Sequence, residues 1–226
     1  MVREQFANRR QAGRLLGEVL SETYADRPDV VVLGLPRGGV EVAYEVARIL
    51  QKPLDVFVVR KLGVPGHEEL AMGAIGSGGS RVMNDEVLTY LHIDDAAIER
   101  TVDREQAELA RRESLFRGDK PMLEVRGKTV LLVDDGLATG SSMRAAIRAL
   151  HAMEPKALVV AVPVGPPETC SALRAEGQAT DVVCLRTPYA FGGVGAWYDD
   201  FTQTTTDQVS ELLAQAEADP NIPPPT

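Results

Sequence analysis

Residues 130–142, VLLVDDGLATGSS, combine residue types that together suit a phosphorylated sugar. Four apolar residues lead to Asp134 and Asp135, and a loop of small residues then opens a segment with helical periodicity. A turn rich in Gly, Thr and Ser at a helix N-terminus presents backbone N–H groups that bind phosphate. Two carboxylates repel phosphate, but they accept hydrogen bonds from vicinal hydroxyls such as those of ribose. The stretch therefore predicts a sugar-phosphate site.

Two other nucleotide-binding motifs do not fit this sequence. A Walker A loop, GxxxxGK[ST], requires a lysine that the 136–142 loop lacks. A dinucleotide fingerprint requires GxGxxG after the first strand, whereas the first predicted strand is followed by LPRGGV.

The composition limits how the chain could bind an anion. The net charge is −9, from 24 basic and 33 acidic residues, which disfavours a general nucleic-acid binder. A phosphate would therefore have to be bound by groups near it, such as backbone amides, a metal ion or a few Arg and Lys side chains. The values of 44 % hydrophobic and 25 % charged residues are ordinary for a globular protein.

The cysteines and the N-terminus predict a cytoplasmic protein without a membrane partner. Cys170 and Cys184 form no CxxC pair and the three histidines are scattered, so we predict no zinc site and a reduced setting. The polar N-terminus is unlike a signal peptide, and no apolar run reaches the ~18 residues of a membrane helix.

Apolar runs that alternate with amphipathic stretches predict an α/β fold, with a central, mainly parallel sheet flanked by helices. The predicted strands are 29–35, 54–59, 128–135, 157–164 and 181–185, and the predicted helices are 4–24, 40–51, 141–153, 167–176 and 206–217. The glycine-rich segment 61–80 indicates a mobile loop that could include a short hairpin. We expect one domain over 1–219 and a loose proline-rich tail over 220–226.

Residues 94–117 are much richer in charged residues than the rest of the chain. Twelve of these 24 residues are charged, and a thin apolar stripe runs through them. The segment predicts a long surface helix with many ion pairs. The alternative is a helical arm that packs on a partner subunit.

The 130–142 stretch resembles the diphosphoribosyl-binding signature of type I phosphoribosyltransferases: a hydrophobic run, two acidic residues, a short gap, then Thr-Gly and a hydroxyl residue. The resemblance covers roughly residues 28–200 and implies the phosphoribosyltransferase-like fold, with helix 94–117 as an insertion. It also implies a homodimer.

The resemblance assigns roles to individual residues. Asp134 and Asp135 would hold the ribose hydroxyls, directly or through Mg²⁺. The 5′-phosphate would lie among Ala138, Thr139, Gly140, Ser141 and Ser142. The diphosphate would meet the turn Pro36, Arg37, Gly38 and Gly39, with Arg37 as a fixed charge, and also Arg60 and Lys61. A non-proline cis peptide is expected between Arg37 and Gly38, and residues 62–79 would be the hood-like loop that closes over the site.

The implied reaction displaces pyrophosphate from phosphoribosyl diphosphate by a nitrogen nucleophile, which would be a nucleobase. Enzymes for 6-oxopurines in this family usually have Asp where this chain has Ala138, which disfavours hypoxanthine and guanine. In the hood-like loop, His67, Glu68 and Glu69 are candidates for catalysis, and solvated loop charge is the alternative.

An acceptor pocket is predicted after the last core strand, where five of the chain's aromatic residues gather in 186–201. Tyr189, Phe191, Trp197 and Tyr198 could stack a flat base. Alternatively, the rings of this segment close the hydrophobic core.

Two further functions stay open at this point. One is a regulatory protein that binds phosphoribosyl diphosphate or a nucleotide without transfer. The other is an interaction module that works through helix 94–117.

Overall fold

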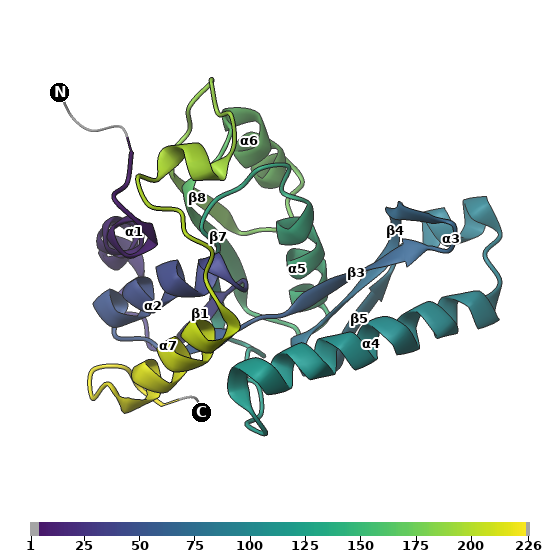
Figure 1. Cartoon of the computed structure of the whole chain (residues 1–226), viewed down its shortest axis with the longest axis horizontal. Helices are drawn as coiled ribbons and strands as arrows, with labels where there is room; N and C mark the ends of the chain where they lie inside the picture. Colours follow the sequence, from purple (N-terminus) through teal and green to yellow (C-terminus); the bar gives the residue numbers. More distant parts are fainter. Residues whose placement is uncertain (1–4, 225–226) are drawn as a thin grey trace.

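A five-stranded parallel sheet forms the centre of the protein. The computed structural model describes residues 5–224. In spatial order the strands are β2 (Leu54–Val56), β1 (Val30–Gly34), β6 (Thr129–Val133), β7 (Ala157–Val164) and β8 (Asp181–Arg186). Every neighbouring pair is parallel, so all five carboxyl ends lie along one edge. The predicted mainly parallel sheet with flanking helices is confirmed (Figure 1).

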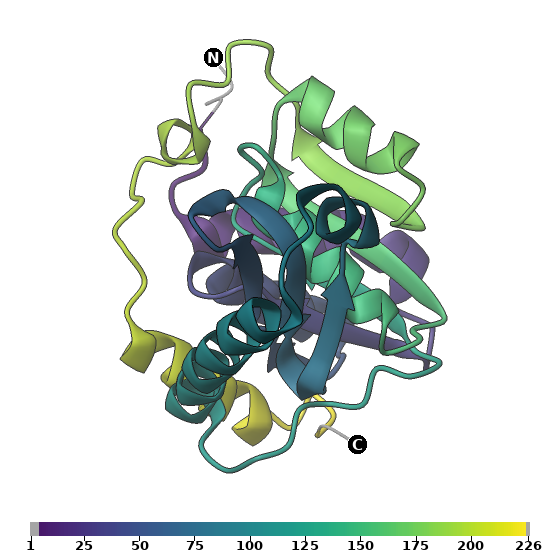
Figure 2. The same ribbon diagram turned by 90° about the vertical axis from the view of Figure 1, so that its right-hand side faces the viewer.

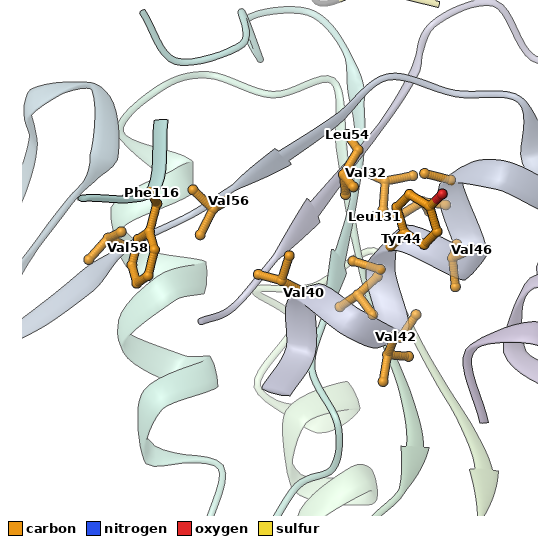
Figure 3. Close-up of a cluster of buried hydrophobic side chains, with 14 of the residues drawn as sticks. Val32, Val40, Val42, Tyr44, Val46, Leu54, Val56, Val58, Phe116 and Leu131 are labelled. Atoms are coloured by element: carbon orange, nitrogen blue, oxygen red, sulfur yellow. The ribbon is translucent and has the colours of Figure 1, made fainter. Parts of the chain in front are cut away.

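Helices cover both faces of this sheet. The helices α1 (Arg9–Tyr24), α2 (Gly38–Leu50) and α7 (Thr206–Ala218) pack on one face. The helices α5 (Ser141–His151) and α6 (Pro167–Ala175) pack on the other. Successive strand residues point to opposite faces, so Val32 joins the first cluster and Leu33 the second. Strands buried on both faces read as the continuous apolar runs seen in the sequence. Figure 3 shows the first cluster.

Two glycines bring α1 unusually close to α2. A Cβ on Gly13 would lie 2.7 Å from the carbonyl oxygen of Val42 and 2.9 Å from the Cβ of Glu45. A Cβ on Gly17 would lie 2.9 Å from Cδ1 of Ile49. Because neither glycine carries a side chain, the two helices lie in contact along their length.

The glycine-rich segment forms a small antiparallel sheet. It contains β3 (Val59–Val64), β4 (His67–Gly76), the 3₁₀ turn η1 (Ser77–Gly79) and β5 (Ser80–Met83), and the strands pair antiparallel in the order β3-β4-β5. The predicted short hairpin is therefore present, as part of a three-stranded sheet. Val64 pairs with His67 across the Pro65-Gly66 turn, where Gly66 has a φ of 79° that favours glycine.

The predicted strand 54–59 is too long, because the chain changes sheets within it. β2 ends at Val56, and β3 begins at Val59. Phe57 and Val58 are buried between the two sheets, which explains why the apolar run continues without a break. The amide of Val58 donates to the hydroxyl of Ser77, 2.9 Å away.

Residues 59–117, named here the arm, extend away from the core (Figures 1 and 2). They comprise β3, β4, β5, α3 (Asp85–Leu91) and α4 (Asp95–Arg117). The predicted long charged helix is confirmed as α4. Its ion pairs include Glu108 with Arg111 and Arg112. Its apolar stripe, including Phe116 (Figure 3), packs within the same chain, so that stripe is not exposed for a partner subunit.

The ends of the chain also differ from expectation. α1 begins at Arg9, because the side chain of Asn8 caps it by accepting from the amide of Gln11. In the tail, Ile222 is buried in the first cluster, so this part is not loose. The rest of the predicted tail, 225–226, lies outside the described residues, as do residues 1–4.

Two further features concern the whole chain. Cys170 of α6 and Cys184 of β8 form a disulfide, a pairing that their spacing did not predict and that differs from the expected reduced thiols. No helix within residues 5–224 has the length and apolar character needed to cross a membrane.

We expect Gly13→Ala to destabilise the protein. Alanine favours a helix by about 1 kcal/mol over glycine. The added Cβ would press on the Val42 carbonyl oxygen, however, and overpacking costs about 1–3 kcal/mol. The free energy of unfolding, measured by urea denaturation, should therefore fall. Glu18→Ala, at an exposed position of the same helix, is the control and should not lower it. A more stable Gly13→Ala variant would mean that the helices can separate at little cost.

Candidate active site

The acidic pair and the glycine turn meet at the carboxyl edge of the sheet. Asp134 and Asp135 follow β6, and residues 35–39 follow β1, its neighbour. Gly34 pairs with Val133 at the ends of these strands, so both loops start at the same level. The amide of Leu35 donates to the carbonyl oxygen of Val133 at 2.8 Å.

Only glycine fits where the turn crosses the acidic pair. A Cβ on Gly38 would lie 2.0 Å from Oδ2 of Asp135. A Cβ on Gly39 would lie 2.9 Å from Oδ1 of Asp134 and 2.8 Å from its Cα. The turn and the carboxylates therefore form one continuous surface.

The cis peptide of this turn lies one bond earlier than predicted. It joins Pro36 to Arg37, and not Arg37 to Gly38. Arg37 is half-buried. Among residues 5–224, its side chain has no ion-pair partner, so the guanidinium can take an external anion.

The predicted phosphate loop opens α5 as the sequence indicated. Gly140 stands before the helix with a φ of 73°, and Ala138, Thr139, Ser141 and Ser142 are exposed. Arg144 donates to the carbonyl oxygen of Thr139 at 2.7 Å, and Thr169 donates to that of Ala138 at 3.0 Å. These bonds turn the loop carbonyls toward the protein. The first-turn N–H groups of α5 have no acceptor within the helix and can bind an anion.

The two basic residues of β3 separate. Nζ of Lys61 lies 3.2 Å from Oγ of Ser141, beside the phosphate loop. Arg60 instead binds Glu105 of α4, with its Nε 2.8 Å from Oε2. Arg60 is therefore engaged by the arm and is not directed to the same loop as Lys61.

A cavity of about 370 Å³ lies between the arm and the start of α5. Its lining includes Lys61, Glu68, Glu69, Arg104 and Ser142. Of the three polar hood residues predicted from the sequence, two thus line this cavity. His67, at the start of β4, is exposed.

The surroundings of the acidic pair disfavour having both carboxyl groups ionised at once. Burial raises the pKa of Asp134 well above its usual value, and the neighbouring Asp135 carboxylate raises it further. Burial also raises the pKa of Asp135, while the Arg9 guanidinium opposes this shift. Oδ1 of Asp134 accepts from the amide of Asp135 at 2.8 Å.

Arg9 is the site residue that sequence reasoning missed. Its Nε donates to Oδ2 of Asp135 at 2.8 Å, across 126 positions of sequence. One arginine among several near a helix start carries no signal in a single sequence. The contact exists only because α1 packs beside the carboxyl edge of the sheet.

The predicted aromatic pocket is not a single surface. Tyr198 is 5 % exposed and packs between Phe6 and Phe201, so its ring is part of the core and cannot stack a base. Its hydroxyl donates to the carbonyl oxygen of Asp135 at 2.6 Å. Tyr189, by contrast, is 94 % exposed. The Trp197 indole donates to the Phe191 carbonyl oxygen at 2.9 Å, and both rings are partly buried. These two remain candidates for the acceptor site.

The donor set at the acidic pair fits a hydrated divalent cation. Carboxylate oxygens are hard ligands, and Mg²⁺ in proteins keeps several waters and shares substrate phosphates. Within residues 5–224 no group of three or more His, Cys, Asp or Glu side chains could enclose a metal ion. Asp134 and Asp135 can thus serve Mg²⁺ only together with water or a ligand.

Comparison with known proteins agrees with this geometry. The model of the phosphoribosyl transferase domain matches residues 3–195. The chain belongs to the phosphoribosyl transferase family. Two similar curated proteins, from two strains of Mycobacterium tuberculosis, are named "Putative phosphoribosyl transferase MT0597" and "Putative phosphoribosyl transferase Rv0571c". Each is 46 % identical over 214 residues, or 95 % of this chain and 47 % of the relative. The chain thus spans about half the length of these relatives.

A solved structure is similar over almost the whole chain. The protein TT1426 from Thermus thermophilus is 44 % identical, with a TM-score of 0.83 over 93 % of this chain and 98 % of that one. The family match over residues 3–195, together with the parallel sheet and its flanking helices, confirms the phosphoribosyltransferase-like fold expected from the sequence.

We predict that Asp134→Asn raises the stability of the metal-free protein at pH 7. The raised pKa means that the folded protein disfavours the charged carboxylate, so stability falls as pH rises through the folded-state pKa. The amide removes this loss. The gain should vanish below about pH 3.9, where Asp is protonated even in the unfolded chain.

Thermal midpoints between pH 3 and 8, measured with a chelator, test this prediction. Asp135→Asn is the matched comparison and should gain less, because it leaves the Arg9 guanidinium without a charged partner. A lower midpoint for Asp134→Asn at pH 7 would contradict the prediction.

Proposed function

We propose that this chain is a Mg²⁺-dependent phosphoribosyltransferase. It would move the 5-phosphoribosyl group from phosphoribosyl diphosphate to a nitrogen acceptor, a nucleobase, and release pyrophosphate. The observation that carries the proposal is the contact of Gly38 and Gly39 with the Asp134–Asp135 pair. A diphosphate on the turn and a ribose on the carboxylates are then adjacent, as they are in the substrate.

The proposed binding mode uses three surfaces. The carboxylates of Asp134 and Asp135 accept hydrogen bonds from the ribose 2′ and 3′ hydroxyls. The exposed loop from Ala138 to Ser142, with the α5 N-terminus, holds the 5′-phosphate. The turn of Pro36, Arg37, Gly38 and Gly39 holds the diphosphate, and Arg37 adds a positive charge. Asp134 and Asp135 would hold Mg²⁺, and the ion would supply positive charge that neutralises part of the leaving group's charge.

In the proposed reaction the acceptor nitrogen forms a bond to C1 of the ribose while the bond to the diphosphate oxygen breaks. The electron pair of the broken bond leaves with pyrophosphate, and the acceptor loses its N–H proton to water. Positive charge develops on the ribose ring and negative charge on the leaving group. Arg37 and the backbone amides of the turn would stabilise the latter. Fixing the two reactants in line supplies much of the remaining rate.

The arm contributes by excluding water in this proposal. Glu68 and Glu69 line the cavity that also contains Lys61 and Ser142. Closing the β3–β4 hairpin over a bound ligand would keep water from the ribose carbon. Arg60, engaged by Glu105, would keep the strand in place more than it binds the diphosphate.

The acceptor is defined only by class. Ala138 offers no carboxylate to a purine ring, so hypoxanthine and guanine are disfavoured as acceptors. Phe191 and Trp197 follow β8 and are both partly buried. We propose these two aromatic side chains as the surface on which the base stacks.

We expect phosphoribosyl diphosphate with Mg²⁺ to bind at micromolar concentration, and Asp135→Asn to weaken it at least about tenfold, or 1.4 kcal/mol. The amide retains the shape of the carboxylate but accepts fewer hydrogen bonds from ribose. Isothermal titration calorimetry measures both values without a choice of acceptor. Asp103→Asn, on the exposed face of α4, is the control and should bind as the wild type does. No binding at millimolar ligand would overturn the proposed function.

A second expectation separates the neighbours Lys61 and Arg60. Lys61→Met should weaken phosphoribosyl diphosphate binding by at least about tenfold, because a charged hydrogen-bond donor beside the phosphate loop contributes about 1.5–3 kcal/mol. Arg60→Met should change affinity less than Lys61→Met does. It should instead lower the thermal midpoint, because the largely buried Glu105 loses its main partner. The reverse order of affinities would place the diphosphate nearer to Arg60 and α4.

A further inference from the structure

Arg9 is almost completely buried, at 6 % exposure, at the first turn of α1. A buried guanidinium must be paired to offset the loss of hydration. Its Nε donates to Oδ2 of Asp135 at 2.8 Å, and its Nη1 donates to the carbonyl oxygen of Thr202 at 2.8 Å. Its Cζ lies 3.9 Å from the centre of the Phe201 ring.

These contacts hold the guanidinium in one orientation. The Phe201 ring fixes its plane, and the Thr202 carbonyl fixes its rotation within that plane. The guanidinium that binds Asp135 is therefore held in place by other residues, and its position does not depend on the Asp135 side chain. A flexible lysine at this position would give the charge but not the fixed direction.

Asp135 is also fixed through its main chain. Tyr198 donates its hydroxyl to the Asp135 carbonyl oxygen at 2.6 Å. Both the backbone and the carboxylate of Asp135 are thus held by residues far away in the sequence.

The same guanidinium touches the glycine turn. A Cβ on Gly38 would lie 2.7 Å from Nε of Arg9, as well as 2.0 Å from the Asp135 carboxylate. Arg9, Asp135 and the turn therefore form one packed layer. Loss of the guanidinium would leave a gap into which the Asp135 side chain can rotate, away from its neighbour Asp134.

The residues that hold Asp135 in place lie outside the sugar-phosphate motif. Arg9 belongs to α1, while Tyr198, Phe201 and Thr202 all follow residue 195, where the family match ends. Two segments at opposite ends of the chain therefore complete a site whose motif lies in the middle.

We propose that Arg9 is a positioning residue, which fixes the Asp135 carboxylate in the orientation that receives the ribose hydroxyls. The assignment rests on the proposed function. In this role Arg9 would act through Asp135, without binding the ribose or the diphosphate itself.

The binding test uses phosphoribosyl diphosphate and, separately, pyrophosphate, each with Mg²⁺, by calorimetry. Arg9→Met should weaken phosphoribosyl diphosphate about as much as Asp135→Asn does, and should weaken pyrophosphate much less, because pyrophosphate has no ribose. The double variant should bind no more weakly than Asp135→Asn alone, since both changes remove one interaction. Additive losses, or equal losses for both ligands, would overturn the positioning role.

Three variants separate positioning from a general effect on folding. Arg14→Met removes a half-exposed arginine of the same helix and should bind as the wild type does. Arg9→Lys should recover only part of the affinity lost in Arg9→Met. Phe201→Leu leaves Arg9 in place but removes the ring beneath it, so it should give a smaller loss of the same kind. This variant decides the matter should Arg9→Met fail to fold.

A measurement without ligand distinguishes failure of this inference from failure of the proposed function. The Arg9 Nε–H resonance, assigned by its absence in Arg9→Lys, should shift in Asp135→Asn and exchange faster with water. An unchanged resonance would overturn the inference even if phosphoribosyl diphosphate binds. A shifted resonance in a protein that binds no phosphoribosyl diphosphate would overturn the function, and the ribose role of Arg9 with it, while leaving the contact established.

Discussion

The site depends on the close approach of two loops that follow neighbouring strands. β1 and β6 pair so that Gly34 and Val133 end at the same level, and both chains then turn over the edge. The turn after β1 can cross the acidic pair only because Gly38 and Gly39 have no side chains. A substrate with a sugar next to a diphosphate needs this short distance between carboxylates and backbone amides. The flanking helices and the sheet order serve to maintain it.

This closeness has an electrostatic cost that the fold offsets from a distance. Asp134 and Asp135 are adjacent and partly buried, and burial raises the pKa of both carboxyl groups. Arg9 supplies the one buried guanidinium, among residues 5–224, that is bonded to Asp135. Sites that bind charged ligands commonly retain such destabilising groups, because removing them would remove the binding. The α1–α2 contact through Gly13 and Gly17 then becomes part of the site, since it holds the helix that carries Arg9.

Much of the core could be predicted from the sequence, for a physical reason. Strands buried on both faces, such as 157–164, are uninterrupted apolar runs, and the phosphate loop is continuous in sequence. The arm was harder, because glycines in 61–80 suit both a mobile loop and tightly packed strands. At Gly76, for example, a Cβ would lie 2.8 Å from the Phe57 ring. Arg9 and the burial of Tyr198 could not be predicted, because both depend on which distant segments pack together.

Helix α4 determines how the hairpin above the site can move. Near its middle, Glu105 binds Arg60 of β3, and at its end Arg117 donates to the Val56 carbonyl oxygen and pairs with Asp55 beside the core sheet. A continuous helix of 23 residues between these anchors does not bend easily. If the hairpin closes as proposed, these anchors would make it tilt together with α4, about the buried end of that helix. Collective motions of this kind take microseconds to milliseconds.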